Sequence, residues 1–391
     1  MKRFGWLLVL MLVASPGWAA KKINVEQLKA MLASMEAARK TDSEVAAALE
    51  NVELTEELTS SAMDSLARQY SGSETAQQLI VLEIRSAVLA PPLADIPAAP
   101  APDAAAQKAI LDKVFDYAGK TFAQLPPVSG TKTVRRFQDN PPLATGIRNA
   151  ALAPSFTPIR YVEVDDYTVT IRDGAETNPL LSVKKSWGAN GEVAPLGQQP
   201  VLSKVLEEAQ GSGRIGFARW ESIDGIQAAV FSFAVDKKKS QFAVNYCCFP
   251  EQDAAGGGAG ADLNMRGGSS AAKGGFSPVA TAVQAGDVYP GFSNWKAVKV
   301  TVPYHGEFAV DPKSGIVVWL TTVAEFKSGW VRQENQRIDY QVEKVGDKSL
   351  VLPGRSSIYT VEQPFGNTES RDPSVRHTLF TAVYKDYKPA S

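Results

Sequence analysis

The chain is 391 residues long, carries a formal net charge of −1 and is 44% hydrophobic by residue count. That length and apolar content suffice for two or three domains, each with a core of its own. The near-zero charge creates no overall field that would attract a phosphate backbone, so we expect no nucleic acid binding. The basic run Lys237-Lys238-Lys239 lies between two apolar segments and is typical of a solvent-exposed turn at a sheet edge.

The first residues have the three parts of a secretory signal. Met1-Lys2-Arg3 gives a positive start, an apolar run follows from residue 6 to 14, and Gly17 and Ala19 are the small residues of a cleavage site. The apolar run is shorter than the ~20 residues that span a bilayer. We therefore predict a signal peptide over residues 1–19, cleavage near Ala19, and a periplasmic or extracellular location. We expect no transmembrane segment in the mature chain.

Residues 20–90 are expected to form a small helical module of four short helices, because apolar residues recur there at spacings of three and four. Helix starts are marked by side chains that can accept a hydrogen bond from the backbone of the first turn. The predicted starts are Asn24 with Gln27, Thr41 with Glu44, Thr55, and Ser71 with Glu74. Pro91-Pro92 ends the last helix.

A linker rich in Pro and Ala is predicted over residues 91–106. After it, residues 107–125 carry a broad apolar stripe at helical spacing, which includes Ile110, Val114 and Phe122. A stripe of this width predicts a helix that covers another apolar surface.

From about residue 131 to the C-terminus the apolar pattern changes to a period of two. Val298, Val300 and Val302, for example, alternate with Ala297, Lys299 and Thr301. This alternation, punctuated by turn signals such as Asp224-Gly225, predicts antiparallel strands with one face on a core.

Three segments interrupt this pattern. Residues 201–210 have helical spacing, Asp165-Asp166 is interpreted as a turn between two strands, and residues 251–275 predict a flexible loop because they are rich in Gly and Ala. We assign residues 107–391 as a whole to one antiparallel β domain.

Two predicted strands are not amphipathic. Residues 316–320 are apolar on both faces, and residues 228–235 have bulky side chains on one face and small ones on the other. Strands of this kind are covered on both sides, and the helix over residues 107–125 is the natural cover. The candidate ligand-binding residues therefore come from these two strands: Phe231, Phe233, Val318, Trp319 and Leu320.

The cysteines form a single adjacent pair, Cys247-Cys248. In an oxidising compartment they predict either a strained vicinal disulfide or two unlinked thiols on opposite faces of a strand, with an intermolecular bridge as a third alternative. The histidines, His305 and His377, are isolated and lack the spacing of metal ligands, so we expect no metal site.

The patterns of known catalytic sites are missing. No G-x-S-x-G nucleophile elbow occurs, and the glycines from Gly211 to Gly216 follow a helix and precede a strand, the reverse of a dinucleotide loop. We therefore predict no cofactor and treat an enzyme as the least favoured hypothesis, which a pocket that groups His305 or His377 with a Ser and a carboxylate would support.

Several segments resemble a family of uncharacterised exported proteins from soil acidobacteria. They are residues 54–59 (LTEELT), 216–221 (GFARWE), 229–233 (AVFSF) and 304–315 (YHGEFAVDPKSG). At the level of the fold, the β region of that family is similar to the periplasmic lipoprotein-carrier (LolA-like) fold, a strongly curved antiparallel half-barrel with helices over its concave, apolar face. The resemblance implies an α+β protein: a helical module followed by a curved half-barrel with a covering helix.

This expected fold gives two functional hypotheses. In the first, the concavity holds an apolar ligand such as a lipid or an acyl chain. In the alternative, the protein is a structural or interaction protein of the cell envelope, with an envelope protein as partner and no small-molecule ligand. An empty apolar cavity would favour the first hypothesis, and an interior filled by side chains would favour the second.

Overall fold

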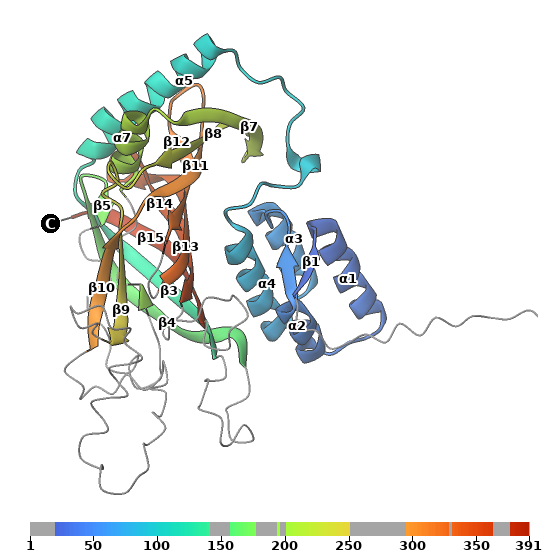
Figure 1. The fold of residues 1–391 in the computed structure, drawn as a ribbon. Coiled ribbons are helices and arrows are strands. Elements are labelled where there is room, and N and C mark those ends of the chain that lie inside the picture. The colour runs from blue at the N-terminus through green and yellow to red at the C-terminus, as the bar shows by residue number, and fades with distance from the viewer. Residues whose placement is uncertain are drawn as a thin grey trace, which may run out of the picture.

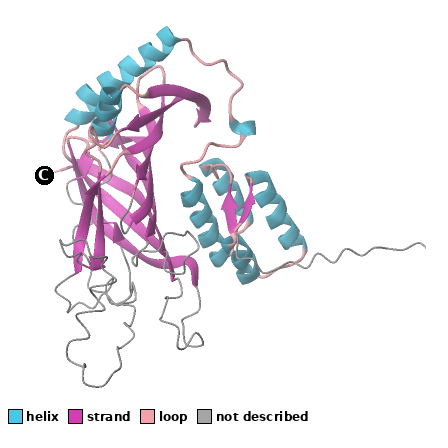
Figure 2. Cartoon of the chain, in the orientation of Figure 1, coloured by secondary structure: helices cyan, strands magenta, loops and turns pink. Residues whose placement is uncertain are grey.

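The computed structural model describes residues 20–140, 157–176, 194–195, 201–250, 295–327, 331–362 and 376–390. Helices and antiparallel strands are both abundant, so the chain is an α+β protein, as predicted (Figures 1 and 2). The predicted signal peptide and the predicted loop over residues 251–275 lie outside the described residues.

The N-terminal part is a helical module with a core of its own. Its helices are α1 (Val25–Ala37), α2 (Asp42–Glu50), α3 (Ser60–Gln69) and α4 (Ser73–Ser86). Leu28, Leu49 and Leu79 meet in its core. Between the helices lie β1 (Lys21–Ile23) and β2 (Val52–Leu54), a parallel pair that the sequence does not predict because three residues are too few to show a period.

Two of the predicted helix starts are confirmed. Asn24 and Gln27 form a reciprocal capping box at α1, and Thr41 and Glu44 form one at α2. The predicted cap at Thr55 is wrong: Thr59 caps α3 instead, because residues 52–54 pair with β1 and delay the helix.

Helix α4 begins differently from the prediction. Its N-cap residue is Gly72, which has no side chain to offer. The carboxylate of Asp42, at the start of α2, accepts hydrogen bonds from the backbone N–H groups of Glu74 (3.0 Å) and Thr75 (2.9 Å). A residue from another helix therefore replaces the local cap that Ser71 was expected to provide.

The segment after α4 runs over the surface to the covering helix. It contains one 3₁₀ turn, Leu93–Asp95, and is held at Pro100, whose carbonyl oxygen accepts a hydrogen bond from Nε1 of Trp220 (2.8 Å). Helix α5 (Ala104–Asp116) follows, and the chain continues through a π-helical segment, Tyr117–Thr121, and a 3₁₀ turn, Phe122–Gln124.

Ten strands form one open antiparallel sheet, in the order β5-β4-β3-β15-β14-β13-β12-β11-β8-β7. The strands are β3 (Val128–Asn140), β4 (Thr157–Arg172), β5 (Ala175–Glu176), β7 (Ile215–Ile223), β8 (Ile226–Val235), β11 (Tyr304–Val310), β12 (Val317–Glu325), β13 (Val331–Val345), β14 (Lys348–Glu362) and β15 (Arg376–Pro389). A second sheet has the order β10-β9-β6, from β6 (Ala194–Pro195), β9 (Ala243–Pro250) and β10 (Trp295–Thr301). The inserted helix α7 (Leu202–Ser212) confirms the helix predicted over residues 201–210.

The predicted turn at Asp165-Asp166 is wrong, because β4 runs unbroken through both residues. In the sheet register Val134 pairs with Asp165, and Thr133 pairs with Asp166. The hydroxyl of Thr133 donates to the Asp166 carboxylate (2.5 Å), and the hydroxyl of Tyr167 donates to Asp165 (3.2 Å). These polar partners let two adjacent acids remain in an extended strand.

The large sheet carries a different layer on each face. On one face, here called the α5 face, a single apolar cluster joins residues of α5 and α7 to strands from β3 to β8. On the other face, here called the module face, α4 of the helical module lies beside the sheet (Figure 1). Val81 and Ile84 of α4 pack there with Phe137, Tyr359 and Leu379 of the sheet. The large sheet thus separates the covering helix from the helical module.

Candidate functional site

Three of the five predicted ligand-binding residues lie together on the α5 face. Phe231, Phe233 and Leu320 are all buried in the cluster below α5 and α7. The ring of Phe231 stacks on Phe308 at 5.7 Å between centroids, and the ring of Phe233 meets Tyr304 edge-on at 5.9 Å. At these positions the space between sheet and helices is filled by side chains.

The other two, Val318 and Trp319, belong to a small cluster on the module face. Trp319 is buried there among Ala228, Val230 and Ala309, and Val318 packs against the same group. Trp319 and Leu320 are neighbours in the regular part of β12 and point to opposite faces, so they cannot line one pocket, whereas Val318 lies where the register with β11 shifts. The predicted set is therefore divided between the two faces.

A group of buried polar side chains crosses the α5 face beside the apolar cluster, and we call it the polar band. It comes from five adjacent strands: Arg136 and Gln138 (β3), Thr378 (β15), Thr360 (β14), Glu334 and Gln336 (β13), and Thr322 (β12). Each of these residues exposes 8% or less of its surface. The strand register aligns them, because Gln138 pairs with Thr378, and Gln336 pairs with Thr322.

Part of the polar band is hydrogen-bonded internally. Arg136 forms an ion pair with Glu163 (2.6 Å), and the hydroxyl of Thr360 donates to the carbonyl oxygen of Thr378 (3.2 Å). The amide nitrogen of Gln336 donates to the carboxylate of Glu334.

Among the uncharged side chains of the polar band, four atoms have no hydrogen-bond partner in the part of the chain that the structure describes. They are Oε1 of Gln138, Oε1 of Gln336, Oγ1 of Thr322 and Oγ1 of Thr378. A buried polar group without a partner costs about 1–3 kcal/mol of stability. The four atoms lie on the same face of the sheet, so the cost is concentrated in the polar band.

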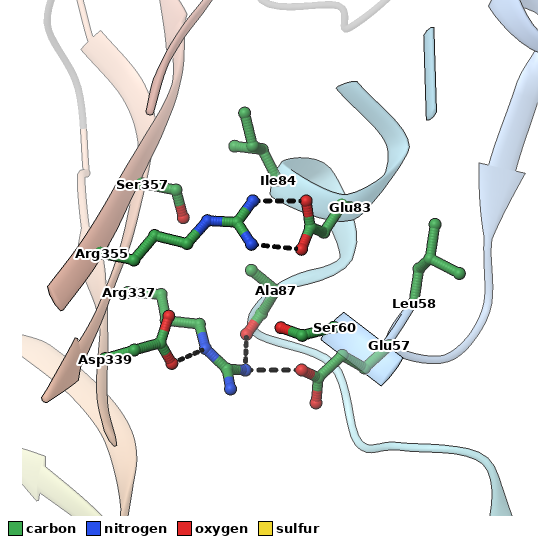
Figure 3. Close-up of a pocket in the computed structure, with 10 residues that line it drawn as sticks. All are labelled: Glu57, Leu58, Ser60, Glu83, Ile84, Ala87, Arg337, Asp339, Arg355 and Ser357. Carbon is green, nitrogen blue, oxygen red and sulfur yellow. Dashed lines mark hydrogen bonds and ion pairs between the residues drawn. The ribbon is translucent and has the colours of Figure 1, made fainter. Parts of the chain in front are cut away.

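On the module face, ion pairs connect the helical module to the large sheet, and we call this region the junction (Figure 3). Arg337 of β13 pairs with Glu57 (2.6 Å) and with Asp339 (2.9 Å). The guanidinium of Arg355 in β14 donates two hydrogen bonds, of 2.8 and 2.5 Å, to the carboxylate of Glu83 in α4. The cavity between these residues has a volume of about 20 Å³, room for one water molecule.

Trp319 extends the junction across the sheet. Arg337 lies 4.9 Å from the centre of its ring, and its Nε1 donates to Glu221 of β7 (3.3 Å). Arg219 then pairs with Glu221 (2.7 Å) and with Glu307 of β11 (2.8 Å). Trp319 is therefore part of a charged network and not of an apolar pocket.

The junction raises the pKa of Glu57. On the sheet, the guanidinium groups of Arg219, Arg337 and Arg355 are matched by carboxylates of the sheet itself, those of Glu221, Glu307 and Asp339. Glu57 therefore adds negative charge to a balanced array, and it is almost completely buried. Burial raises its pKa to about 7, against the attraction of Arg337, which lowers it.

A second titratable group lies at the apolar end of the contact between module and sheet. Nδ1 of His377 is 2.7 Å from the hydroxyl of Tyr359, which is in the apolar cluster with α4. Burial, together with the nearby positive charge of Arg85, lowers the pKa of His377 to about 4. His377 is therefore neutral at physiological pH.

The remaining candidates of the sequence are not brought together. His305 is on the surface, 2.9 Å from Glu325. Cys247 and Cys248 lie in β9, but their side chains are outside the described residues, so their pairing stays a prediction. Among the described residues, no three His, Cys, Asp or Glu side chains are grouped as metal ligands. Within the same ranges, no helix combines the length and hydropathy needed to cross a membrane.

Neither the polar band nor the junction is predicted by the sequence. Alternating Thr and Gln residues in β12–β15 have the pattern of a solvent-facing strand surface, and nothing in a single strand shows that the surface will be covered. The junction joins residues more than 200 positions apart, which no local pattern encodes.

No family model, curated protein or solved structure matches this chain. Its function is therefore argued from these sites alone.

Proposed function

We propose that this is an exported envelope protein that holds an apolar ligand, a lipid or an acyl chain, in the concavity of a half-barrel below α5. The observation that carries the proposal is the weak attachment of the cover. Of the 13 residues of α5, Ile110 and Val114 are buried in the large cluster below the helix, and Leu111 and Phe115 pack against it while remaining partly exposed. The proposed binding residues are those of this cluster, with Phe231, Phe233 and Leu320 among them.

A cover of this kind is displaceable. Burial of a Val or Ile side chain stabilises a contact by about 1.5–3 kcal/mol, so α5 is attached by two such side chains together with the half-buried contacts of Leu111 and Phe115. Polar contacts add Lys113, whose Nζ donates to the carbonyl oxygens of Pro312 (3.0 Å) and Lys313 (3.3 Å) on the β11–β12 turn. An acyl chain offers the same kind of apolar surface as Ile110 and Val114 and can replace their contacts with the cluster.

The test uses dodecanoate as the ligand, with native mass spectrometry and tryptophan fluorescence as readouts. Val114→Ser weakens the cover without touching the sheet, and we expect it to bind dodecanoate several-fold more tightly than the wild type. Lys108→Ser, on the exposed face of α5, is the matched control and should bind as the wild type does. If dodecanoate does not bind and protein purified from its host carries no lipid, the proposal is wrong.

A second candidate is favoured by a different observation, the dense packing of Phe231, Phe233, Phe308 and Tyr304. A filled interior suits a structural or interaction protein of the envelope, in which the sheet presents the helical module to a partner. Crosslinking in the host envelope tests it. We then expect one reproducible partner, which is lost when Arg337→Glu and Arg355→Glu release the module.

A further inference from the structure

An open groove of about 460 Å³ lies on the helical module between β1 and α1 (Figure 1). One wall is β1, through Lys21, Lys22 and Ile23. The other wall is a stripe of α1 at helical spacing: Gln27, Ala30, Met31, Ser34 and Met35. The residues that line the groove thus include two lysines and no acid.

The wall formed by α1 offers an adaptable apolar surface. Met31 and Met35 are half-buried and pack against the module core beside Ile23. A thioether side chain has several rotatable bonds and fits apolar groups of different shapes. The groove can therefore accept an apolar side chain from a partner.

Strand β1 also has an unpaired backbone edge. Toward β2, the N–H of Lys21 donates to the carbonyl oxygen of Asn51 (2.7 Å), and the carbonyl oxygen of Ile23 accepts from Thr55 (3.0 Å). Backbone groups alternate between the two edges of a strand, so the N–H and C=O of Lys22 face away from β2. Among the described residues, no strand pairs with that edge of β1. It offers one donor and one acceptor to an added strand.

The lysines determine which strand can be added. In a symmetric pairing of β1 with a second copy, Lys22 or Lys21 would lie opposite itself, and like charges in that position are destabilising. Lys22 has only an exposed ion pair with Glu53 (3.6 Å), and Lys21 has none within the described chain. Charge complementarity therefore favours an acidic strand over a second copy.

We propose that this groove binds an extended acidic peptide segment of a partner protein, which pairs with the open edge of β1. The peptide residue opposite Lys22 shares its face of the sheet, so an acid is favoured there. The two flanking peptide residues point to the face of Ile23 and contact Met31 and Met35. The recognised pattern is thus apolar-acidic-apolar. This site is independent of the ligand proposed below α5, because no residue of the groove belongs to that cluster.

The test measures fluorescence anisotropy of the end-capped peptide Glu-Leu-Glu-Leu-Glu, carrying an uncharged fluorophore, with the full mature chain. We expect it to bind at least about tenfold more tightly than Lys-Leu-Lys-Leu-Lys. N-methylation of its central Glu removes the N–H that donates to the carbonyl oxygen of Lys22, and should weaken binding by about tenfold without any change to the protein.

Ala30→Glu tests the position of the groove. Ala30 is exposed, so the variant should fold, and its carboxylate repels the acidic peptide and narrows the groove. We expect binding to weaken by at least about tenfold. Ala33→Glu is the matched control, because Ala33 is exposed on the same helix but does not line the groove.

Lys22→Pro and Lys22→Gln test the strand edge. Both remove the charge, but only proline removes the N–H that faces the groove, and the bonds of Lys21 and Ile23 to β2 remain. The proline variant should bind the acidic peptide about fivefold more weakly than the glutamine variant.

Three results would overturn the proposal: no binding of the acidic peptide, equal binding of the basic one, or normal binding by Ala30→Glu. Vesicles of phosphatidylglycerol are the further probe. If they bind in an Ala30→Glu-sensitive way while the peptide does not, the groove faces a membrane and the proposal is wrong. Urea unfolding of each variant confirms that a loss of binding is not a loss of folding.

Discussion

The carboxylate of Asp42 caps the N-terminus of α4, although Asp42 itself lies in the first turn of α2. It accepts two backbone hydrogen bonds from α4 while its own backbone begins α2. The arrangement needs a glycine at position 72, because a Cβ there would lie 2.1 Å from the Asp42 carboxylate. The absence of a side chain at Gly72 thus makes room for a cap from elsewhere.

Gly72→Ala should lower the free energy of unfolding by about 1–2 kcal/mol, because the added methyl group displaces Asp42 and leaves two helix N–H groups without a partner. Urea unfolding followed by circular dichroism measures the effect. Gly211→Ala is the control: no atom lies within 4 Å of its Cβ position in α7, so this variant should be neutral or up to about 1 kcal/mol more stable. Equal stability of the two variants would contradict the assignment of Asp42 as the cap.

The helix caps show what the sequence can and cannot predict about single residues. The capping boxes at Asn24 and Thr41 use partners three residues away, and they were predicted correctly. Ser71 with Glu74 has the same spacing, but Asp42, 32 residues from Glu74, takes its place. A local motif identifies a residue that is able to cap, and the tertiary structure decides which residue does.

At the scale of elements, the contact between the helical module and the large sheet contains two groups whose pKa values are shifted in opposite directions. The pKa of Glu57 is raised to about 7 from an ordinary value of 4.5, and that of His377 is lowered to about 4 from 6.5. Glu57 contributes stability that is complete below pH 4.5 and lost as the pH rises through 7. His377 contributes stability that is present above pH 6.5 and lost as the pH falls toward 4.

Glu57→Gln should remove the pH dependence of the stability that Glu57 causes. Between pH 5 and pH 8 the stability of this variant, measured relative to the wild type, should rise by roughly 2 kcal/mol, because only the wild type must ionise a buried carboxyl group. Urea midpoints across the pH range measure this. Glu53→Gln, on the exposed surface of β2, is the control. If the urea midpoints of wild type and E57Q change in parallel with pH, the folded protein does not resist the ionisation of Glu57, and the raised pKa is contradicted.

His377→Gln should have the opposite effect. As the pH falls from 7 to 4.5, this variant should become more stable relative to the wild type, by about 1 kcal/mol because His377 keeps some contact with solvent. The same urea series measures it, with His305→Gln as a control at an exposed histidine. No relative gain on acidification would mean that His377 is protonated without disturbing the contact.

Strand β4 shows why an element can be misread. Asp165 and Asp166 are frequent in turns, and two adjacent acids suggested one. Their partners Thr133 and Tyr167 come from the neighbouring strand and from two residues further on, and together they make an unbroken strand possible. The strand predicted around residues 297–302 is confirmed as β10, which ends at Thr301, because its alternating pattern is carried by that strand alone.

At the scale of the molecule, the helical module and the large sheet have separate cores, joined by the junction and by the apolar contact of Val81 and Ile84 with the sheet. The α+β class and the helix over the sheet could be predicted from the change of period along the chain. The docking of the module could not be predicted. In the sequence Glu57 and Glu83 have the pattern of surface acids, and their partners Arg337 and Arg355 are far away along the chain.

The strength of this docking can be measured by cutting the linker. With a protease site inserted after Ala98, cleavage should leave the two parts together on gel filtration at neutral pH. Adding Arg337→Glu and Arg355→Glu places like charges opposite Glu57 and Glu83, and the cleaved parts should then elute separately. Arg214→Glu, at an exposed ion pair of the sheet with Asp236, is the control and should not separate them. Separation of the cleaved wild type would show that the linker alone holds the module.

The pairing of β3 with β15 has a consequence for the time course of folding. Val134 pairs with Ala382, so β3, the first strand of the large sheet along the chain, has one unpaired edge until β15, the last strand, pairs with it. During synthesis almost the whole chain must emerge while the hydrogen-bonding groups of β3 remain open on that side. Closure over so long a loop is slow, which makes the nascent chain vulnerable to mispairing at this edge until its C-terminus arrives.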